Sequence, residues 1–511
     1  SASLQQEFLT SNSAYNYFNN GGTTLLVTRV VSGSFTSATS TNISGSGVAV
    51  ATSFTLKTFG EGEIMNSSGS EVDGALVSGS SDNLRWEVAG FSTSSGTFSL
   101  IISRGDHTTS EKTVLESYAN LSLDPTAPNY ISKVIGDSYK TVNTSDTTPY
   151  VQDNGTFPNR SRYVYVSAVN SKTPQYFDNN GDFKSEYTAS LPAVASGSFE
   201  NATGQVYFNT AGAAFNEKIT TAANIQGLNN TNYTTSIDLL SNQDEYNFNS
   251  ITVPGIMIET APSTTTKLIN MVQERGDALA IVDASTYGAT INAMTAEASA
   301  YNSSYAAVYA PWLQTTSPET GELVWVPAST MIPGVYAYND RVGEAWFAPA
   351  GLNRGGLATV VRPERKFSQA NRDTLYQGKV NPIASFPGSG TVVFGQKTLQ
   401  TKASALDRVN VRRLLIELKS YISQVADNLV FEQNTIATRN AFLSQVNPYL
   451  ESVQQRQGLY AFRVIMDDSN NTADVIDRNE LIGQIYLQPT KTAEFIYLDF
   501  NVLPTGATFP A

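Results

Sequence analysis

The stretch SALDRVNVRRLLIELKSYISQVADNLVF, residues 404–431, decides the fold of the C-terminal part of this chain. Its apolar side chains recur every three or four positions, as in a helix that packs one face against a core. The positions that form this stripe are Val411, Leu414, Leu418, Ile422, Val425 and Leu429. The spacing therefore predicts one long amphipathic helix from Ser404 to about Phe431.

Three basic residues, Arg408, Arg412 and Lys419, lie beside the apolar stripe of the predicted helix. At 100° per residue they fall within about 40° of one another, so they form a single ridge. Arg413 points well away from that ridge. The ridge is a candidate surface for contact with another protein.

Downstream of this helix, a second helix is expected to about Gln457, followed by strands at 459–466 and 494–502. In the last strand, apolar side chains alternate onto both faces, which is the pattern of a covered strand. One face carries Phe495, Tyr497 and Asp499, and the other carries Ile496, Leu498 and Phe500.

Upstream of the helix, residues 256–400 alternate between helix-like and strand-like segments. Residues 265–276 favour a helix, and the apolar runs at 278–283 and 304–310 favour buried strands. This alternation predicts an α/β layer.

The N-terminal half is expected to be richer in β-structure. Residues 1–31 read as a helix, a stop at Asn19-Asn20-Gly21-Gly22 and a strand from Thr23 to Val30. Ser, Thr and Gly with short alternating apolar runs then predict a β-rich insertion over 32–118 and a second β-rich domain over 119–255. With an α/β domain at 256–400 and a last domain at 401–511, the predicted fold class is multidomain α+β.

Composition excludes several classes of function. The 511 residues hold 45 Asp and Glu against 32 Lys and Arg, a net charge of −13, which argues against a nucleic-acid partner. The chain has no Cys, so disulfides, thiol catalysis and Cys-ligated metals are excluded. No apolar run approaches the roughly 18 residues that a membrane span needs, and Ser1 opens a polar helix-like stretch rather than a signal peptide.

The motifs that could carry chemistry are weak. Gly390–Thr398 nearly matches a phosphate-binding loop, but Gln396 separates the second Gly from Lys397. The oxygen-rich run 467–474 lacks the Gly and the distal Glu of a calcium loop. The only histidine, His107, sits in a polar turn. We therefore expect a protein that is not an enzyme, with no catalytic residue, cofactor or metal ion.

Charge is segregated along the chain. Residues 341–420 hold 13 Lys and Arg against 5 Asp and Glu, whereas residues 464–511 hold 2 against 7. A basic block inside an acidic protein suits a specific acidic protein surface.

Several blocks of this sequence resemble the contractile tail sheath proteins of T-even-like phages. In chain order they are Tyr17–Gly22, Leu123–Tyr130, Val326–Gly351, Val393–Leu414, Phe431–Thr435 and the ending that includes Asn470–Thr472 and Ala493–Ile496. The resemblance covers roughly residues 1–30, 120–136 and 270–511. Between these blocks the β-rich regions carry no recognisable similarity, which fits the family's variable insertions.

The resemblance implies a subunit that stacks as sixfold rings around a tail tube and contracts to drive the tube through the host envelope. It implies α/β and α+β inner domains and β-rich outer insertions. Extended arms would join neighbouring C-terminal domains by strand addition. Arg408, Arg412 and Lys419 would face the tube, and the intersubunit strand would contain Phe495, Ile496, Tyr497, Leu498 and Phe500.

The implied partners are further copies of the chain, the tail tube protein, and baseplate and neck or terminator proteins, with no nucleic acid and no membrane insertion. The implied location is the virion tail, and the host cytoplasm during assembly. No nucleotide is consumed, because the energy is stored in the assembly.

Two alternatives belong to other classes. The Ser/Thr-rich regions and the tripeptides Arg104-Gly105-Asp106 and Arg275-Gly276-Asp277 would suit a β-rich adhesin or receptor-binding protein. A carboxylate-based glycan hydrolase is the third interpretation, which turnover of cell-wall or capsule glycans would reveal.

Overall fold

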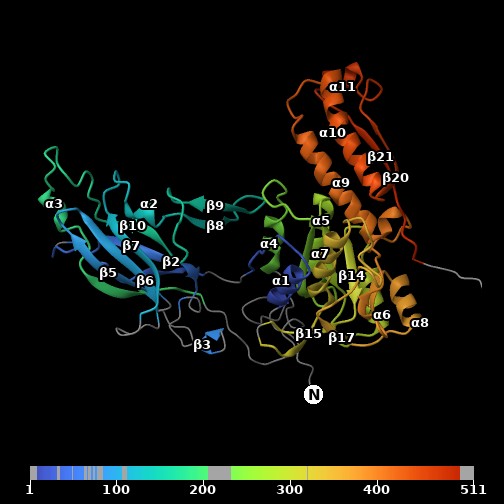
Figure 1. The fold of residues 1–511 in the computed structure, drawn as a ribbon, viewed down its shortest axis with the longest axis horizontal. Coiled ribbons are helices and arrows are strands. Elements are labelled where there is room, and N and C mark those ends of the chain that lie inside the picture. Colours follow the sequence, from blue (N-terminus) through green and yellow to red (C-terminus); the bar gives the residue numbers. More distant parts are fainter. Residues whose placement is uncertain are drawn as a thin grey trace, which may run out of the picture. The chain divides into compact units, whose positions relative to one another are not determined.

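The computed structural model describes residues 9–30, 35–48, 50–62, 66, 71–72, 75–76, 84–105, 112–204, 232–318 and 320–494 (Figure 1). These residues fall into two compact units. The first unit contains residues 9–28 and 240–494, and the second contains the described residues between 29 and 239. Among the described residues, the chain leaves the first unit after residue 28 and is next found in it at residue 240, so the second unit is an insertion.

The inserted unit is built around one antiparallel sheet with the strand order β10-β2-β1-β11-β5-β6-β7. These strands are β1 (Ser37–Ser40), β2 (Phe54–Glu61), β5 (Leu84–Ser92), β6 (Thr97–Arg104), β7 (Val114–Ser122), β10 (Val164–Val169) and β11 (Ala195–Glu200). Two short hairpins, β3 (Glu71–Val72) with β4 (Ala75–Leu76) and β8 (Tyr139–Asn143) with β9 (Tyr150–Asn154), accompany the sheet, together with helices α2 (Ile131–Val134), α3 (Ser185–Thr188) and α4 (Tyr233–Leu239).

The predicted boundary between β-rich domains at residues 118 and 119 does not exist in this sheet. β2 pairs with β10, and β5 pairs with β11, so strands from both sides of the boundary share one ladder. They also share one core, in which Trp86 and Leu100 lie in the same buried cluster as Val164 and Phe199. The physical reason is that each strand buries its apolar face only when the other half of the sheet is present.

The first unit contains the predicted α/β layer. Its main sheet has the order β12-β13-β14-β18-β19, with parallel pairing up to β18 and antiparallel pairing of β19. The strands are β12 (Ser250–Met257), β13 (Leu279–Asp283), β14 (Ala306–Ala310), β18 (Val380–Phe386) and β19 (Gly390–Val393). The helices are α1 (Leu9–Asn19), α5 (Pro262–Arg275), α6 (Ile291–Ser299), α7 (Ile332–Val342) and α8 (Gln369–Gln377). A smaller antiparallel sheet contains β15 (Leu313–Thr316), β16 (Leu323–Val326) and β17 (Val360–Pro363).

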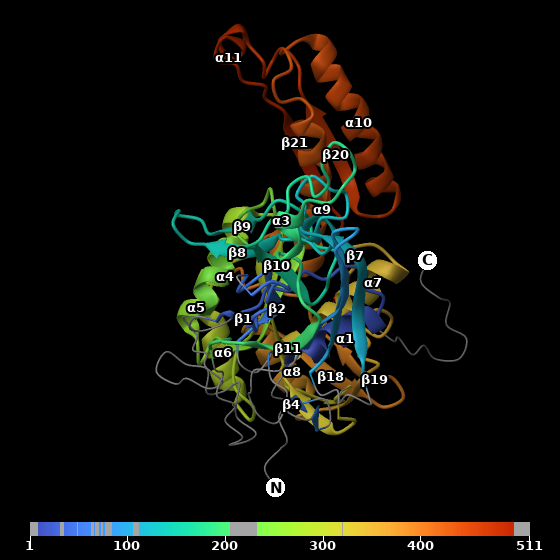
Figure 2. The ribbon, with the colours of Figure 1, turned by 90° about the vertical axis from the view of Figure 1, so that its left-hand side faces the viewer.

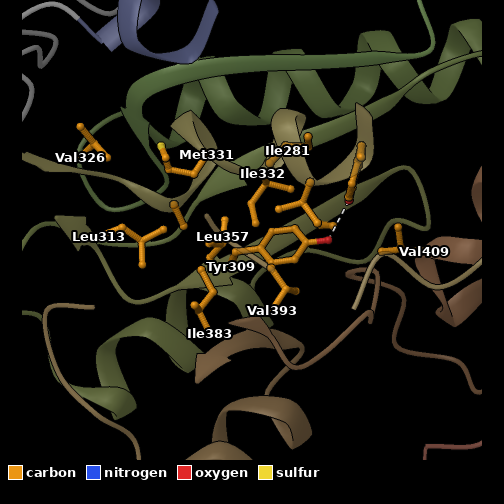
Figure 3. Close-up of a cluster of buried hydrophobic side chains, with 14 of the residues drawn as sticks. Ile281, Tyr309, Leu313, Val326, Met331, Ile332, Leu357, Ile383, Val393 and Val409 are labelled. Carbon is orange, nitrogen blue, oxygen red and sulfur yellow. Dashed lines mark hydrogen bonds between the residues drawn. The ribbon is translucent and has the colours of Figure 1, made fainter. Parts of the chain in front are cut away.

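Local sequence explains these elements. The runs at β13 and β14 are short and apolar, and every residue in both strands is buried, as expected for parallel strands covered on both faces. Gly276 follows the last residue of helix α5, and its φ of +69° is the left-handed geometry that glycine adopts without steric cost. In the core, the hydroxyls of Tyr309 and Tyr336 lie 2.7 Å apart (Figure 3).

The strand predicted from Thr23 to Val30 is absent. Residues 22–30 form no strand, and the side chains of Leu25, Leu26 and Val27 are exposed. Strand-forming residues need a neighbouring ladder, and no described strand pairs with this segment.

The C-terminal part contains a helical pair covered by a two-stranded sheet. It comprises the 3₁₀ turn η4 (Ala405–Asp407), helices α9 (Val409–Asp427), α10 (Ile436–Gln455) and α11 (Ala473–Asp477), and the antiparallel strands β20 (Leu459–Ile465) and β21 (Gln484–Pro489). The turn between α9 and α10 lies at the same end as α11 (Figure 2). The predicted apolar stripe packs here, because its residues from Leu414 to Leu429 lie in or against the cluster shared with α10 and β20.

Asp283 is a buried carboxyl at the end of β13. It accepts hydrogen bonds from the backbone N–H and the hydroxyl of Ser329, in the 3₁₀ turn η3 (Ala328–Thr330). Burial raises the pKa of Asp283 to about 6, although these hydrogen bonds oppose the shift.

We predict that Asp283→Asn makes the unfolding free energy of the α/β core less dependent on pH. A raised folded-state pKa contributes stability that is present below the unfolded pKa of 3.8 and is lost as the pH rises through about 6. The wild type should therefore lose up to about 3 kcal/mol relative to the variant between pH 4 and 7. Urea unfolding followed by tryptophan fluorescence measures this. Parallel pH profiles would contradict the assignment.

We also predict different outcomes for two deletions. Removal of residues 32–118 takes away β1, β2, β5, β6 and the first half of β7, so the rest of the β unit should unfold. Replacement of residues 29–239 by a Gly/Ser linker should leave the first unit folded. Circular dichroism and limited proteolysis compare the two products. A cooperative near-native melt for the 32–118 deletion would show that the sheet has two independent halves.

Candidate functional site at helix α9 and the C-terminal segment

Arg408 does not belong to helix α9. Its φ of −116° and ψ of 136° are extended, because residues 407–409 hydrogen-bond to the chain at 396–398. Thr398 N donates to the Asp407 carbonyl at 3.0 Å, and Val409 N donates to the Gln396 carbonyl at 2.8 Å. The helix therefore begins at Val409 rather than at Ser404, which caps the preceding 3₁₀ turn.

Arg412 is buried within the first unit. Its guanidinium lies 3.9 Å from the centre of the Tyr305 ring and donates a hydrogen bond to the hydroxyl of Ser304. Burial lowers the pKa of Arg412, and the described residues offer it no carboxylate partner.

Lys419 contacts the end of another helix. Its Nζ donates to the carbonyl of Arg275 at 3.0 Å, and Arg275 is the last residue of α5. A cation at this position satisfies a carbonyl that has no partner inside the helix and complements the helix dipole.

The predicted single exposed ridge of Arg408, Arg412 and Lys419 is therefore not formed. Arg408 precedes the helix, Arg412 is buried, and Lys419 binds α5. Tertiary contacts, which helical periodicity cannot show, determine all three positions. Contact of these residues with a tube stays an untested prediction.

Arg413, which points away from the predicted ridge, is buried and anchors the helix on α7. Its Nη2 donates to both carboxylate oxygens of Asp340 in α7, at 2.8 Å to the first. The guanidinium also lies 4.6 Å from the centre of the Tyr336 ring. Burial raises the pKa of Tyr336 to about 12, and the positive charge of Arg413 opposes this shift. One feature of the sequence indicates this role: Arg413 lies close to the apolar stripe.

Glu494 is the last described residue, and a set of donors surrounds its carboxylate. Arg408 Nε donates at 2.7 Å, the Tyr376 hydroxyl at 2.7 Å and Gln396 Nε2 at 3.1 Å. Gln396 Nε2 also donates to Thr492 Oγ1 at 2.7 Å. We call Glu494 with these three donors the C-terminal anchor, because it fixes the start of the following segment on the first unit.

The anchor shifts the acidities of its members. Burial, and then the charge and hydrogen bond of Glu494, raise the pKa of Tyr376 far above its usual value, so its hydroxyl remains a donor. Burial alone would lower the pKa of Arg408, but the hydrogen bond and charge of Glu494 raise it. The predicted intersubunit strand residues Phe495, Ile496, Tyr497, Leu498 and Phe500 lie outside the described residues.

An apolar groove of about 340 Å³ lies between α9 and β21. Its apolar wall is formed by Leu415, Leu418 and Ile422 of α9 and by Ile485 and Leu487 of β21, with Arg412 and Lys419 beside them. Among the described strands, none pairs with the outer edge of β20 or of β21. The groove thus runs beside an open sheet edge. In a sheet, alternate side chains of an added strand would point into such a groove.

The other motifs have structural roles. Lys397, in the stretch that nearly matches a phosphate-binding loop, donates to the Tyr376 carbonyl at 2.9 Å. Arg275 of the second Arg-Gly-Asp tripeptide is buried and donates to its own Asp277 at 3.0 Å and to the Leu240 carbonyl at 2.6 Å. It is therefore unavailable as an adhesive arginine. His107 and Asp106 lie outside the described residues.

The acidic run 467–474 forms a turn closed by its own hydrogen bonds. The Asp467 carboxylate accepts from Ser469 N at 2.8 Å and from the Ser469 hydroxyl, and these bonds lower its pKa. Within the described ranges, no group of three or more Asp, Glu or His side chains is placed to hold a metal ion. No described helix is both long enough and apolar enough to cross a membrane.

Comparison with known proteins gives consistent results over the C-terminal three fifths of the chain. Residues 200–399 match the phage tail sheath protein central domain, and residues 401–503 match the phage tail sheath C-terminal domain. The tail sheath proteins of Vibrio phage KVP40 and Enterobacteria phage T4 are 45% and 40% identical over 185 residues. In both cases the match spans 36% of this chain and 28% of the length of the relative.

A solved structure shares the fold. The crystal structure of a sheath tail protein from Listeria innocua superposes with a TM-score of 0.50 at 10% identity, covering 91% of this chain and 83% of that one.

We predict that Glu494→Gln releases the start of the C-terminal segment. The change removes the negative charge that Arg408 and Tyr376 bind, and partly buried charged hydrogen bonds contribute about 1–3 kcal/mol. Amide exchange over residues 490–494 should rise several-fold, while exchange in α9 stays unchanged. Lys491→Gln, an exposed change in the same segment, is the matched control. Equal exchange in both variants would mean that the anchor does not hold the segment.

Proposed function

Because the chain belongs to the phage tail sheath family, we propose that it is a structural subunit of a contractile tail sheath that polymerises as sixfold rings around a tail tube. Contraction of the polymer would drive the tube through the host envelope. The subunit acts as a mechanical component rather than as an enzyme, and its location is the virion, after assembly in the host cytoplasm.

The observation that carries this proposal is the open edge of β21 beside the apolar groove. An isolated two-stranded sheet is marginally stable in water and has unpaired backbone donors and acceptors along both edges. β20 and β21 rest on α9 and α10 through Phe462, Val464, Ile485 and Leu487. A strand added along β21 would pair its edge and cover the groove with apolar side chains. Strand addition is a recurrent mode of protein association.

The proposed donor is the C-terminal segment of a neighbouring copy. Residues 495–502 carry one charge, on Asp499, and their alternating pattern leaves Ile496, Leu498 and Phe500 on one face. That face matches the apolar wall of the groove. The C-terminal anchor at Glu494 supports this arrangement, because a fixed starting point reduces the conformational entropy lost when the segment binds.

Main-chain links of this kind suit a polymer that changes shape. Hydrogen bonds along an added strand depend little on side-chain identity, so they can persist while rigid units rotate about their connections. Neighbouring rings would stay joined as the lattice shortens. The tail tube, baseplate and neck or terminator proteins are the further partners of this proposal, and the tube contact is the one for which Arg408, Arg412 and Lys419 stay candidates.

We predict that Ser423→Trp blocks polymerisation without unfolding the subunit. Ser423 lines the groove and is exposed, so an indole there would occupy the space of the added strand. The concentration needed for tubular polymer, measured by sedimentation and negative-stain electron microscopy, should rise at least about tenfold. A change in affinity of that size is within reach of a single large side chain at an interface.

Gln424→Trp is the matched control, because Gln424 is the next exposed residue on α9 and does not line the groove. A second variant that ends after Glu494 keeps the anchor but removes the donor, and it should remain monomeric. Tubes of wild-type length from Ser423→Trp and from the truncated chain would refute strand addition at β21.

A further inference from the structure

The turn between α9 and α10 displays a fully exposed aromatic side chain. Phe431 has 103% of its reference area exposed, and its neighbours Val430 and Ile436 are 59% and 64% exposed. We call Val430, Phe431 and Ile436 the apolar tip. A cluster of exposed apolar side chains at the end of a domain is a feature of interaction surfaces.

Phe431 also has an unfavourable backbone conformation. Its φ of +72° lies in the left-handed region, which is sterically unfavourable for a bulky L-residue and which Gly or Asn would adopt more easily. The ring is fully exposed, so burial of the ring does not stabilise the folded chain. Folding alone therefore does not explain a phenylalanine at this position.

A polar network fixes the chain between Phe431 and helix α10. Asn434 Nδ2 donates to the Glu480 carbonyl at 2.8 Å, and Asn434 Oδ1 accepts from Arg439 Nε at 2.8 Å. Arg439 is buried and donates to Asp468 at 2.6 Å. Asn471, also buried, accepts from Asn434 Nδ2 at 3.2 Å. A preorganised aromatic side chain loses little entropy on binding, which is the property of an interface hot spot.

The charge around the tip favours a basic partner. Glu432 follows Phe431 directly and is exposed, whereas the charge of Asp468 is balanced by its ion pair with Arg439. The same chain carries a surface of opposite character, formed by Arg372, Phe386 and Phe394. The Arg372 guanidinium lies 5.4 Å from the centre of the Phe386 ring and 5.8 Å from that of Phe394.

This surface is available for binding. The Phe394 side chain is 46% exposed. Arg372 donates to the Phe367 carbonyl at 3.0 Å, but it has no carboxylate partner within the described part of the chain. We call these three residues the arginine–phenylalanine patch. It offers an apolar surface with an uncompensated positive charge, the complement of the apolar tip with its negative charge.

A helical polymer of identical subunits needs such complementary surfaces. Contacts that repeat head to tail use two different patches of the same chain, unlike the self-complementary contacts of a symmetric dimer. We propose that the apolar tip of one copy docks on the arginine–phenylalanine patch of a second copy, with Phe431 against Phe394 and Glu432 near Arg372. This inference rests on the proposed function, and it adds a contact that uses neither β21 nor the C-terminal segment.

Phe431→Gly tests the proposal because it separates folding from assembly. Glycine relieves the positive φ, so the melting temperature of the full chain should stay equal or rise. The concentration needed for polymerisation should rise at least about tenfold, as for the loss of an aromatic hot spot. The matched control is Gln457→Gly, which relieves a similar φ of +65° at the other end of α10 and should polymerise as the wild type does.

A charge exchange and a cross-link identify the partner surface. Glu432→Arg and Arg372→Glu should each weaken polymerisation, and the double variant should recover it. A photo-reactive benzoylphenylalanine placed at position 431 of the assembled chain should give dimers linked within residues 368–372 or 384–397 of a second copy. Cross-links to another protein, to the groove beside β21 or to no chain would overturn the proposal.

These outcomes are distinguishable from failure of the proposed function. Polymer formed equally by the wild type and by Phe431→Gly would overturn the tip contact alone. If the wild-type chain forms no polymer with or without tail tubes, the proposed function fails, and the tip contact fails with it.

Discussion

Helix α9 is held on the α/β core by basic side chains, and the arrangement of the C-terminal part depends on these contacts. Arg413 pairs with Asp340 of α7, Arg412 stacks on Tyr305 before β14, and Lys419 binds the end of α5. The same helix forms one wall of the apolar groove. The buried guanidinium groups of Arg412 and Arg413 would raise the free energy of the folded state without these partners, so the helix is stable in this position rather than in a shifted one. The position of helix α9 therefore determines the orientation of the groove and of the open sheet edge.

Much of the fold could be predicted from local patterns. The stripe from Val411 to Leu429 and the apolar run of β13 both follow from side-chain periodicity, which depends only on nearby residues. The division of the β-rich half could not be predicted in this way. β2 pairs with β10 across more than one hundred residues, and no local pattern reports which distant strand completes a sheet. In the segment 23–30 the local pattern favours a strand, but no described strand pairs with it, so the strand does not form.

The candidate site was harder to predict from the sequence than the fold. The ridge assigned to Arg408, Arg412 and Lys419 assumed one continuous helix with a solvent-exposed face. In the structure, Arg408 lies before the helix because the backbone around it pairs with residues 396–398. Arg412 is buried against Ser304 and Tyr305. The anchor at Glu494 was also missed, since its donors come from three separate parts of the sequence. Clusters of this type become visible only when the chain is folded.

The insertion of the β unit between residues 28 and 240 has a mechanical consequence. Tension applied to the C-terminal segment would enter at Glu494 and pass through Arg408 and α9 into the parallel sheet, all within the first unit. Because both ends of the inserted unit connect to that same unit, this path does not run through the inserted unit. Its sequence can therefore diverge, or its surface can acquire new binding properties, while the elements that bear the load keep their geometry.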